Sequence, residues 1–203
     1  MKEIYFAGGC FWGTEHYFKQ IYGVISTEVG YSNGNTSNPT YDQVYTDTTG
    51  YAECVKVVFN PSDITLEYLV ELFFRSIDPL SLNRQGNDCG TRYRTGVYYI
   101  DNDDITKIKS IFDIVEQKVG EPLAVELCPL KNFYPAEEYH QDYLDKNPNG
   151  YCHIPSALAF QAGRQIVLEM EQVIAYANRH GIAIAGVKCD LPPAPTRPEE
   201  VVP

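Results

Sequence analysis

Residues 3–13 read Glu-Ile-Tyr-Phe-Ala-Gly-Gly-Cys-Phe-Trp-Gly, and they contain the clearest structural pattern of the chain. Its first five residues are mostly apolar and predict a short buried strand over 3–7. The pair Gly8-Gly9 predicts a turn, and Cys10 then begins a helix that is expected to run over 10–21 and to end at Gly23. The chain therefore opens with a strand, a glycine turn and a helix.

The same kind of pattern continues along the chain. Strands are predicted over 24–31, 53–59 and 96–100, and a helix over 64–76. Polar loops rich in Asn, Gly, Ser and Pro lie at 32–40 and 80–94. The resulting order, βαββαβ, is typical of the ferredoxin-like arrangement, in which helices cover a single face of an antiparallel sheet. The sequence thus predicts an α+β protein with a ferredoxin-like two-layer sandwich as its core.

The remainder of the chain is predicted to add smaller elements and an extension. They are a helix over 103–118, short strands near 123–127 and 131–134, and a helix over 136–144. An amphipathic helix is predicted over 157–179, and we expect its apolar stripe to dock on the domain rather than face solvent. The proline-rich residues after Cys189 predict a flexible tail. We therefore expect a main domain over 1–154, a helical extension over 155–188 and a tail over 189–203.

The composition is that of an ordinary globular protein. The chain has 203 residues, of which 44% are hydrophobic and 21% charged, enough for one domain with a core. Its formal net charge of -11 repels phosphate backbones and anionic lipids, so we expect no nucleic-acid partner and no membrane partner. Apolar runs are too short for a transmembrane helix or for a signal peptide at the N-terminus. We therefore expect a cytoplasmic protein.

The six cysteines include no Cys-x-x-Cys pair, so no metal site is expected. Cys10 differs from the others, because it follows a strand and a glycine turn and begins a helix. Unpaired backbone N–H groups at a helix start stabilise a thiolate, which would lower the pKa of Cys10 and make it a nucleophile. The alternative is a buried, inert cysteine beside two aromatic core residues.

Glu53 is the second candidate for chemistry. Alternation in the strand over 53–59 places Glu53 on the same face as Val55 and Val57, which should pack under the helices. Burial raises the pKa of a carboxyl group, so Glu53 would hold a proton at neutral pH and could donate it. The alternative is an exposed glutamate at a strand end. The long loops supply further polar candidates, at 39–42 and 83–94.

At residues 9–13 the sequence resembles the signature of the peptide methionine sulfoxide reductase A family. Further matches follow in the family's order, at 30–31, 38–41, 49–53, 78–79, 83–88, 93–94, 136–141 and 146–152. The resemblance covers residues 3 to about 154. The chain departs from the family at Tyr51, where the family usually has His, and over 155–203, where a short tail would be expected.

The resemblance implies an enzyme that reduces methionine-S-sulfoxide, free or in proteins, to methionine, with 1–154 as its catalytic domain. Cys10 would attack the sulfoxide sulfur, and Glu53 would donate the proton. The other site residues would bind the substrate, with an aromatic pocket for its methyl group, hydroxyls for its oxygen and a supporting carboxylate: Phe11 and Trp12, Tyr41 and Tyr93, and Asp88.

The resemblance also implies how the enzyme is recycled. Attack leaves Cys10 as a sulfenic acid, which Cys152 would convert to a disulfide. Thioredoxin or dithiothreitol would then reduce this disulfide, and no metal or organic cofactor is needed. The segment over 147–151 is expected to be flexible enough to bring Cys152 to Cys10. Cys189 is either a second recycling thiol or an unpaired one.

Other chemistry stays open from the residues alone. A thiol peroxidase or another cysteine-nucleophile enzyme would also use Cys10, and an acyl-transfer hydrolase would need a histidine base beside it. His16 lies on the same predicted helix but on another face, and the sequence gives no position for His140 or His153. A peptide-binding module lined by aromatic residues is the alternative that is not an enzyme. Formation of sulfide from methyl p-tolyl sulfoxide with dithiothreitol would separate these hypotheses.

Overall fold

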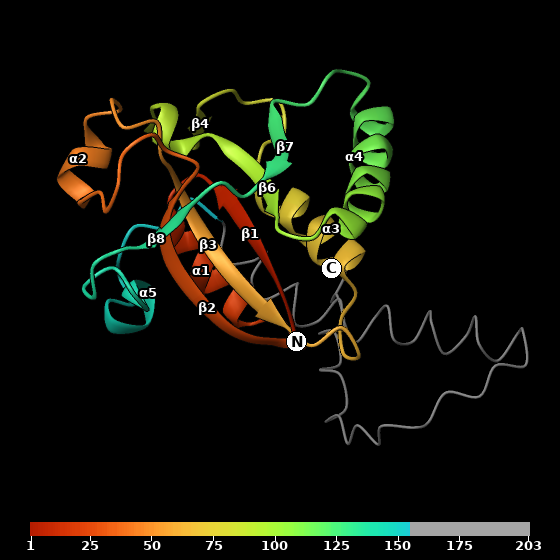
Figure 1. Cartoon of the computed structure of the whole chain (residues 1–203), viewed down its shortest axis with the longest axis horizontal. Helices are drawn as coiled ribbons and strands as arrows, with labels where there is room; N and C mark the ends of the chain where they lie inside the picture. Colours follow the sequence, from red (N-terminus) through yellow and green to blue (C-terminus); the bar gives the residue numbers. More distant parts are fainter. Residues whose placement is uncertain (155–203) are drawn as a thin grey trace, which may run out of the picture. The chain divides into compact units, whose positions relative to one another are not determined.

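The computed structural model describes residues 1–154, which are built around a six-stranded sheet (Figure 1). The strands, in the order β7-β6-β1-β3-β2-β8, are β1 (Lys2–Gly8), β2 (Val24–Ser32), β3 (Ala52–Phe59), β6 (Thr95–Tyr99), β7 (Val125–Pro129) and β8 (Phe133–Pro135). The predicted helix over 157–179, the predicted tail and Cys189 lie outside the described residues.

The α+β class is confirmed, and the sheet is larger than the predicted core. The central strands β6-β1-β3-β2 pair antiparallel, in the order that a βαββαβ unit requires. At one edge β7 pairs parallel with β6, and at the other β8 pairs antiparallel with β2, so the whole sheet is mixed. The sequence predicts both outer strands, but their places in the sheet depend on contacts that are distant along the chain.

The longer helices agree with the prediction to within a few residues. They are α1 (Phe11–Lys19), α3 (Leu66–Ser76) and α4 (Ile105–Val119), and α3 and α4 lie side by side (Figure 1). A short helix that was not predicted, α2 (Tyr41–Tyr45), begins after Thr40, which forms a reciprocal capping box with Gln43. No helix within residues 1–154 is long and apolar enough to cross a membrane.

The predicted helix over 136–144 is wrong. Residues 138–142 form turns, Asp142 has a φ of 54°, and within 136–146 only α5 (Tyr143–Lys146) is helical. The physical reason is a side chain that bonds to the sheet. The amide of Gln141 accepts a hydrogen bond from the N–H of Val29 and donates one to its carbonyl, both at 2.9 Å. These bonds tie the segment to β2.

The main hydrophobic core lies between the helices and one face of the sheet. Phe6 on β1 stacks on Phe18 of α1 and on Phe73 of α3, with ring centroids 4.5 Å and 5.0 Å away, so both helices cover the same face. Each buried ring contributes roughly 2 kcal/mol through removal of its apolar surface from water. A smaller apolar cluster lies on the opposite face: Tyr5, Ala7, Ala52, Cys54 and Tyr98.

The turn after β1 is held by close packing against a small hairpin, β4 (Arg84–Gln85) and β5 (Asp88–Cys89). Gly9 has a φ of 85°, and a Cβ on it would lie 2.6 Å from the Cβ of Gln85, so glycine is required. Gln85 is buried, and its side-chain amide exchanges two hydrogen bonds of 2.8 Å with the backbone of Asp78. The hairpin therefore lies against the start of α1.

Candidate active site

Cys10 is the N-cap residue of α1 and is 6% exposed. The backbone N–H groups of Trp12 and Gly13 lower the pKa of the thiol, as the sequence predicts for a helix start. Burial and the charge of Glu53 act in the opposite direction and are stronger, so the pKa of Cys10 is well above its ordinary value. The expected net decrease is therefore wrong for the substrate-free protein, because desolvation exceeds the effect of the helix.

Glu53 is buried, with 1% of its surface exposed, and shares the face of β3 that Val55 and Val57 present to the main core. The alternation argument is confirmed here. The carboxylate accepts a 3.0 Å hydrogen bond from the N–H of Phe11, the residue after Cys10. Burial raises the pKa of Glu53 to about 8, although this hydrogen bond and the charge of Arg92 oppose the rise. Glu53 is therefore mostly protonated at neutral pH.

Tyr41 and Tyr93 come from different elements and lie near Glu53. Tyr41 is the first residue of α2, and its N–H donates a 2.8 Å hydrogen bond to the carboxylate of Glu137. Burial, followed by the charges of Glu53 and Cys10, raises the pKa of Tyr41 to about 12. Tyr93 is 8% exposed in the 3-10 turn η1 (Thr91–Tyr93), and burial and Glu53 raise its pKa as well. Both hydroxyls therefore keep their protons and can donate them.

Arg92 is a site residue that the sequence reasoning missed. Its guanidinium lies between the rings of Tyr45 and Tyr93, with Cζ 4.3 Å and 4.5 Å from the two centroids. It donates a 2.9 Å hydrogen bond to Asp47, and its charge lowers the pKa of Glu53. Apart from Tyr93, its partners Tyr45 and Asp47 lie at and after the end of α2, far away in the sequence, so only the position beside Tyr93 could have pointed to it.

An aromatic wall stands beside Cys10. Trp12 is half-buried and stacks on Tyr143 with centroids 3.7 Å apart, and its indole N–H donates a 3.1 Å hydrogen bond to Nδ1 of His140. Phe11 is 1% exposed and belongs to the main core, with its ring 5.1 Å from that of His140. His140 was also missed; it is buried among these rings and that of Tyr41, and burial lowers its pKa. It is therefore neutral at pH 7 and orients Trp12.

Asp88 lies on β5, and its charge reaches the site. One carboxylate oxygen, Oδ2, is buried without a hydrogen bond. The charge of Asp88 raises the pKa values of Cys10, Glu53 and Tyr151. The structure therefore brings Asp88 near both catalytic candidates, and leaves an acceptor oxygen available to a hydroxyl or water.

Cys152 lies over the first turn of α1. A Cβ on Gly13 would be 3.1 Å from its sulfur, and its S–H donates to the carbonyl of Ile154 at 3.2 Å. Ile154 is 4% exposed and part of the main core, so the segment that carries Cys152 packs on the domain. A swing of Cys152 on a flexible 147–151 segment would require this segment to be detached. The other described cysteines lie elsewhere, and the five within residues 1–154 are all free thiols.

Tyr51, where the family usually has His, has a structural position. Its ring is 1% exposed and packs so closely on Gly34 that a Cβ there would overlap it. Its hydroxyl donates a hydrogen bond to the carbonyl of Thr36. Tyr51 therefore holds the loop between β2 and α2. This loop leads to Tyr41, the first residue of α2.

The geometry does not favour an acyl-transfer hydrolase. Such an enzyme needs a histidine that accepts the proton of the nucleophile. His16 faces Asp145 at 3.4 Å, His140 is bonded to Trp12, and His153 is bonded to the carbonyl of Gly8 at 2.8 Å. Within the described part of the chain, no hydrogen bond joins an imidazole to Cys10.

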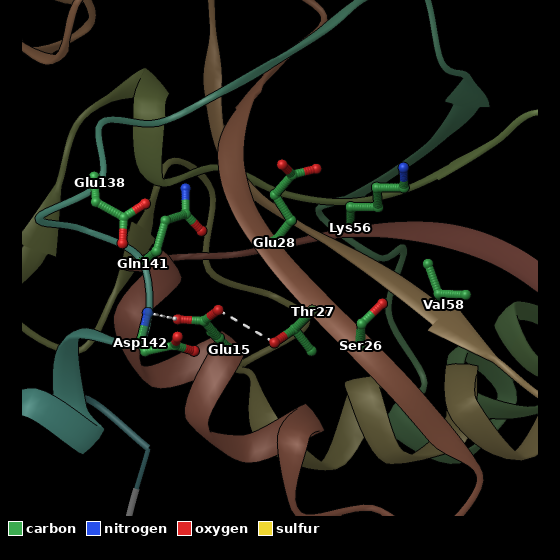
Figure 2. A pocket seen from close by; sticks show the side chains of 9 residues that line it. All are labelled: Glu15, Ser26, Thr27, Glu28, Lys56, Val58, Glu138, Gln141 and Asp142. Atoms are coloured by element: carbon green, nitrogen blue, oxygen red, sulfur yellow. Dashed lines mark hydrogen bonds between the residues drawn. The ribbon is translucent and has the colours of Figure 1, made fainter.

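A separate groove lies between α1, β2 and the turns before α5 (Figure 2). Its lining is polar except for Val58 and comprises Glu15, Ser26, Thr27, Glu28, Lys56, Val58, Glu138, Gln141 and Asp142. The carboxylate of Glu15 accepts hydrogen bonds from the Thr27 hydroxyl and from the N–H of Asp142, at 3.2 Å and 2.9 Å. The lining of this groove includes no cysteine, and its buried carboxylate, Glu15, is bonded to neighbours within the groove.

Comparison with known proteins agrees with this geometry. The peptide methionine sulfoxide reductase family matches residues 2–170. The peptide methionine sulfoxide reductase MsrA of Clostridium acetobutylicum is 55% identical over 158 residues, which are 78% of this chain and 98% of that protein. Mxr1 of Saccharomyces cerevisiae in its reduced form is 42% identical with a TM-score of 0.72, covering 76% of this chain and 89% of the other.

A second structure of yeast Mxr1, in complex with Trx2, is 30% identical with a TM-score of 0.50 and covers 70% of this chain and 84% of the other. The family match extends over most of the chain, and the relative in Clostridium is matched over nearly its whole length. The chain therefore belongs to the MsrA family of peptide methionine sulfoxide reductases, the enzymes that reduce methionine sulfoxide to methionine.

Proposed function

We propose that Cys10 is the nucleophile of this reductase and that Glu53 is its proton donor. The observation that carries the proposal is the buried carboxyl of Glu53, whose pKa is about 8 and which bonds to the N–H of the residue after Cys10. A carboxyl group that is protonated at neutral pH can give its proton to an oxygen that gains charge during the reaction. The catalytic domain would comprise residues 1–154, on a ferredoxin-like unit.

The first half-reaction transfers one oxygen atom. The sulfur of Cys10 attacks the sulfur of methionine-S-sulfoxide, and the sulfoxide oxygen takes a proton from Glu53. The oxygen then passes to the sulfur of Cys10: the S–O bond of the sulfoxide and the transient S–S bond break, an S–O bond to Cys10 forms, and methionine leaves with the electron pair, so that Cys10 becomes a sulfenic acid. When Glu53 holds its proton, its charge no longer opposes the thiolate of Cys10, so the acid and the nucleophile support each other.

The substrate is held by two kinds of contact. The hydroxyls of Tyr41 and Tyr93 remain protonated and donate hydrogen bonds to the sulfoxide oxygen. Trp12, held by His140 and Tyr143, offers an apolar surface to the methyl group, and Phe11 supports it from within the core. Asp88 accepts a hydrogen bond behind the reacting atoms.

The second half-reaction restores the thiol. The sulfur of Cys152 attacks the sulfur of the sulfenic acid, a disulfide forms and water leaves. Thioredoxin then reduces the disulfide by thiol exchange, and the solved complex of the relative Mxr1 with Trx2 supports this partner. The substrate is free methionine sulfoxide or the oxidised residue in a protein.

The test follows the reduced product in a single turnover: methionine from free methionine-S-sulfoxide, and methyl p-tolyl sulfide from methyl p-tolyl sulfoxide. Cys10→Ser should release none, because a hydroxyl does not supply a thiolate. Cys152→Ser should release one methionine per enzyme and stop as a sulfenic acid, whereas Cys189→Ser should keep turnover with thioredoxin. Activity of Cys10→Ser above about one per cent would point to another nucleophile, since losing the reacting atom should remove many kcal/mol of catalysis.

A further inference from the structure

His153, the residue after Cys152, has one nitrogen bonded and one free. Its Nε2 lies 2.8 Å from the carbonyl oxygen of Gly8. A carbonyl only accepts hydrogen bonds, so Nε2 must carry the hydrogen. In the neutral ring Nδ1 then carries no hydrogen and has a lone pair that can accept a proton. This Nδ1 is buried and has no hydrogen-bond partner.

The free nitrogen lies beside the thiol of Cys152. A Cβ on Gly13 would be 3.1 Å from Nδ1 of His153 and 3.1 Å from the sulfur of Cys152. Two atoms at that distance from a common point are at most about 6 Å apart, and rotation of the thiol about χ1 moves the sulfur by several ångströms. Release of the hydrogen bond with the carbonyl of Ile154 would free the thiol for such a rotation toward Nδ1.

The thiol needs such a base. Burial raises the pKa of Cys152, so the thiol holds its proton in the docked position. Only the thiolate is an effective nucleophile toward a sulfenic acid. Burial also lowers the pKa of His153, against the effects of the Gly8 carbonyl and of Asp88, so the ring is neutral near pH 7.

The position of His153 also places the attacking sulfur. Gly13 follows Cys10 by three residues on α1, and such residues are neighbours on one helix face. The bond to Gly8 fixes the ring beside the turn that precedes Cys10, and Ile154 is anchored in the core. Cys152 is thereby held next to the turn of α1 that carries the sulfenic acid.

We propose that His153 is the general base of the recycling step, which removes the proton of Cys152 as its sulfur attacks Cys10. The S–S bond forms, the S–O bond of the sulfenic acid breaks, and the departing hydroxide takes a proton to leave as water. The imidazolium returns the proton it received, so the step is balanced: a sulfenic acid and a thiol give a disulfide and water. This inference rests on the proposed role of Cys152.

The test separates disulfide formation from sulfoxide reduction. His153→Gln keeps an amide N–H near the position of Nε2, for the Gly8 carbonyl, but has no basic nitrogen near Nδ1. Enzyme is mixed with one equivalent of methionine sulfoxide; methionine is measured by rapid quench, and the Cys10–Cys152 disulfide by mass spectrometry after alkylation. His16→Gln is the matched control, because His16 is a half-buried residue of α1 that pairs with Asp145.

The expected result is an unchanged release of one methionine in both variants. Disulfide formation at pH 7 should slow on the order of 10²-fold in His153→Gln, since a general base contributes about 10²–10⁴-fold, and should keep its rate in His16→Gln. In the wild type the rate should rise with pH and level off above an inflection below 6.5, the ordinary histidine pKa. In His153→Gln this inflection should disappear.

The groups that face His153 are Asp88 on the hairpin, and Tyr151 and Cys152 in its own segment. Only the inflection of His153 itself should vanish with the substitution. A wild-type rate in His153→Gln, or a slower rate with the inflection intact, would overturn the role as a base. A wild type that forms no Cys10–Cys152 disulfide would instead overturn the proposed recycling scheme.

Discussion

Substituting Glu53 with glutamine should change activity and stability in opposite directions. Glu53→Gln keeps the side-chain size and an oxygen that accepts the hydrogen bond from Phe11, but it has no acidic proton. Folding raises the pKa of Glu53 from 4.5 to about 8, mainly through burial. At about 1.4 kcal/mol per pKa unit, the ionised form costs about 5 kcal/mol more in the folded protein than in the unfolded chain.

The sign of the pH dependence follows from proton binding. The folded protein binds the proton of Glu53 more tightly than the unfolded chain does, so the free energy of unfolding falls as pH rises from 4.5 through 8 and then levels off. Glutamine does not titrate, so the variant lacks this fall. The free energy of unfolding of the variant minus that of the wild type should therefore be larger above pH 8 than at low pH, by up to about 5 kcal/mol. Its single-turnover rate at pH 7 should fall by about 10²–10⁴-fold.

Urea unfolding at pH 5, 7 and 9 measures the stability, and rapid-quench release of methionine measures the rate. Glu15→Gln is the matched control, because Glu15 is also a buried carboxyl group with a raised pKa but is bonded to Thr27 and Asp142. It should keep the wild-type rate. A wild-type rate in Glu53→Gln would refute the role as proton donor, and parallel stability curves from pH 5 to 9 would refute the raised pKa.

Three further substitutions test the geometry. Gly13→Ala should slow disulfide formation and spare the first release of methionine, because the new Cβ would lie 3.1 Å from the sulfur of Cys152; equal slowing of both steps in rapid-quench experiments would contradict this. Arg92→Leu removes a charge that lowers the pKa of Glu53, so the alkaline inflection of the single-turnover rate should move to higher pH, and a move to lower pH would be contrary evidence. Tyr51→Phe loses a hydrogen bond and should reduce the free energy of unfolding by about 1 kcal/mol with the rate unchanged; a rate loss would mean that this loop shapes the site.

Some features of the protein follow from local sequence alone. The alternation over 53–59 has a period of two, so it places Glu53 on the apolar face whichever strands lie beside it. The strand, glycine turn and helix at 3–19 depend on neighbouring residues, and the element order βαββαβ limits the central sheet to few arrangements. These patterns were sufficient for the fold class and for Cys10 and Glu53 as candidates.

Only the tertiary structure decided the properties that depend on distant residues. The pKa of Cys10 is a sum of helix, burial and carboxylate effects, and the sequence shows only the first. Arg92 stacks on Tyr45 at the end of α2, and His153 bonds to the first strand across most of the chain. The segment over 136–142 turns instead of forming a helix because Gln141 bonds to β2. The periodicity of the sequence indicates which face of a strand or helix is buried. Charge, desolvation and hydrogen bonding act through space, so they depend on which distant residues the fold places side by side.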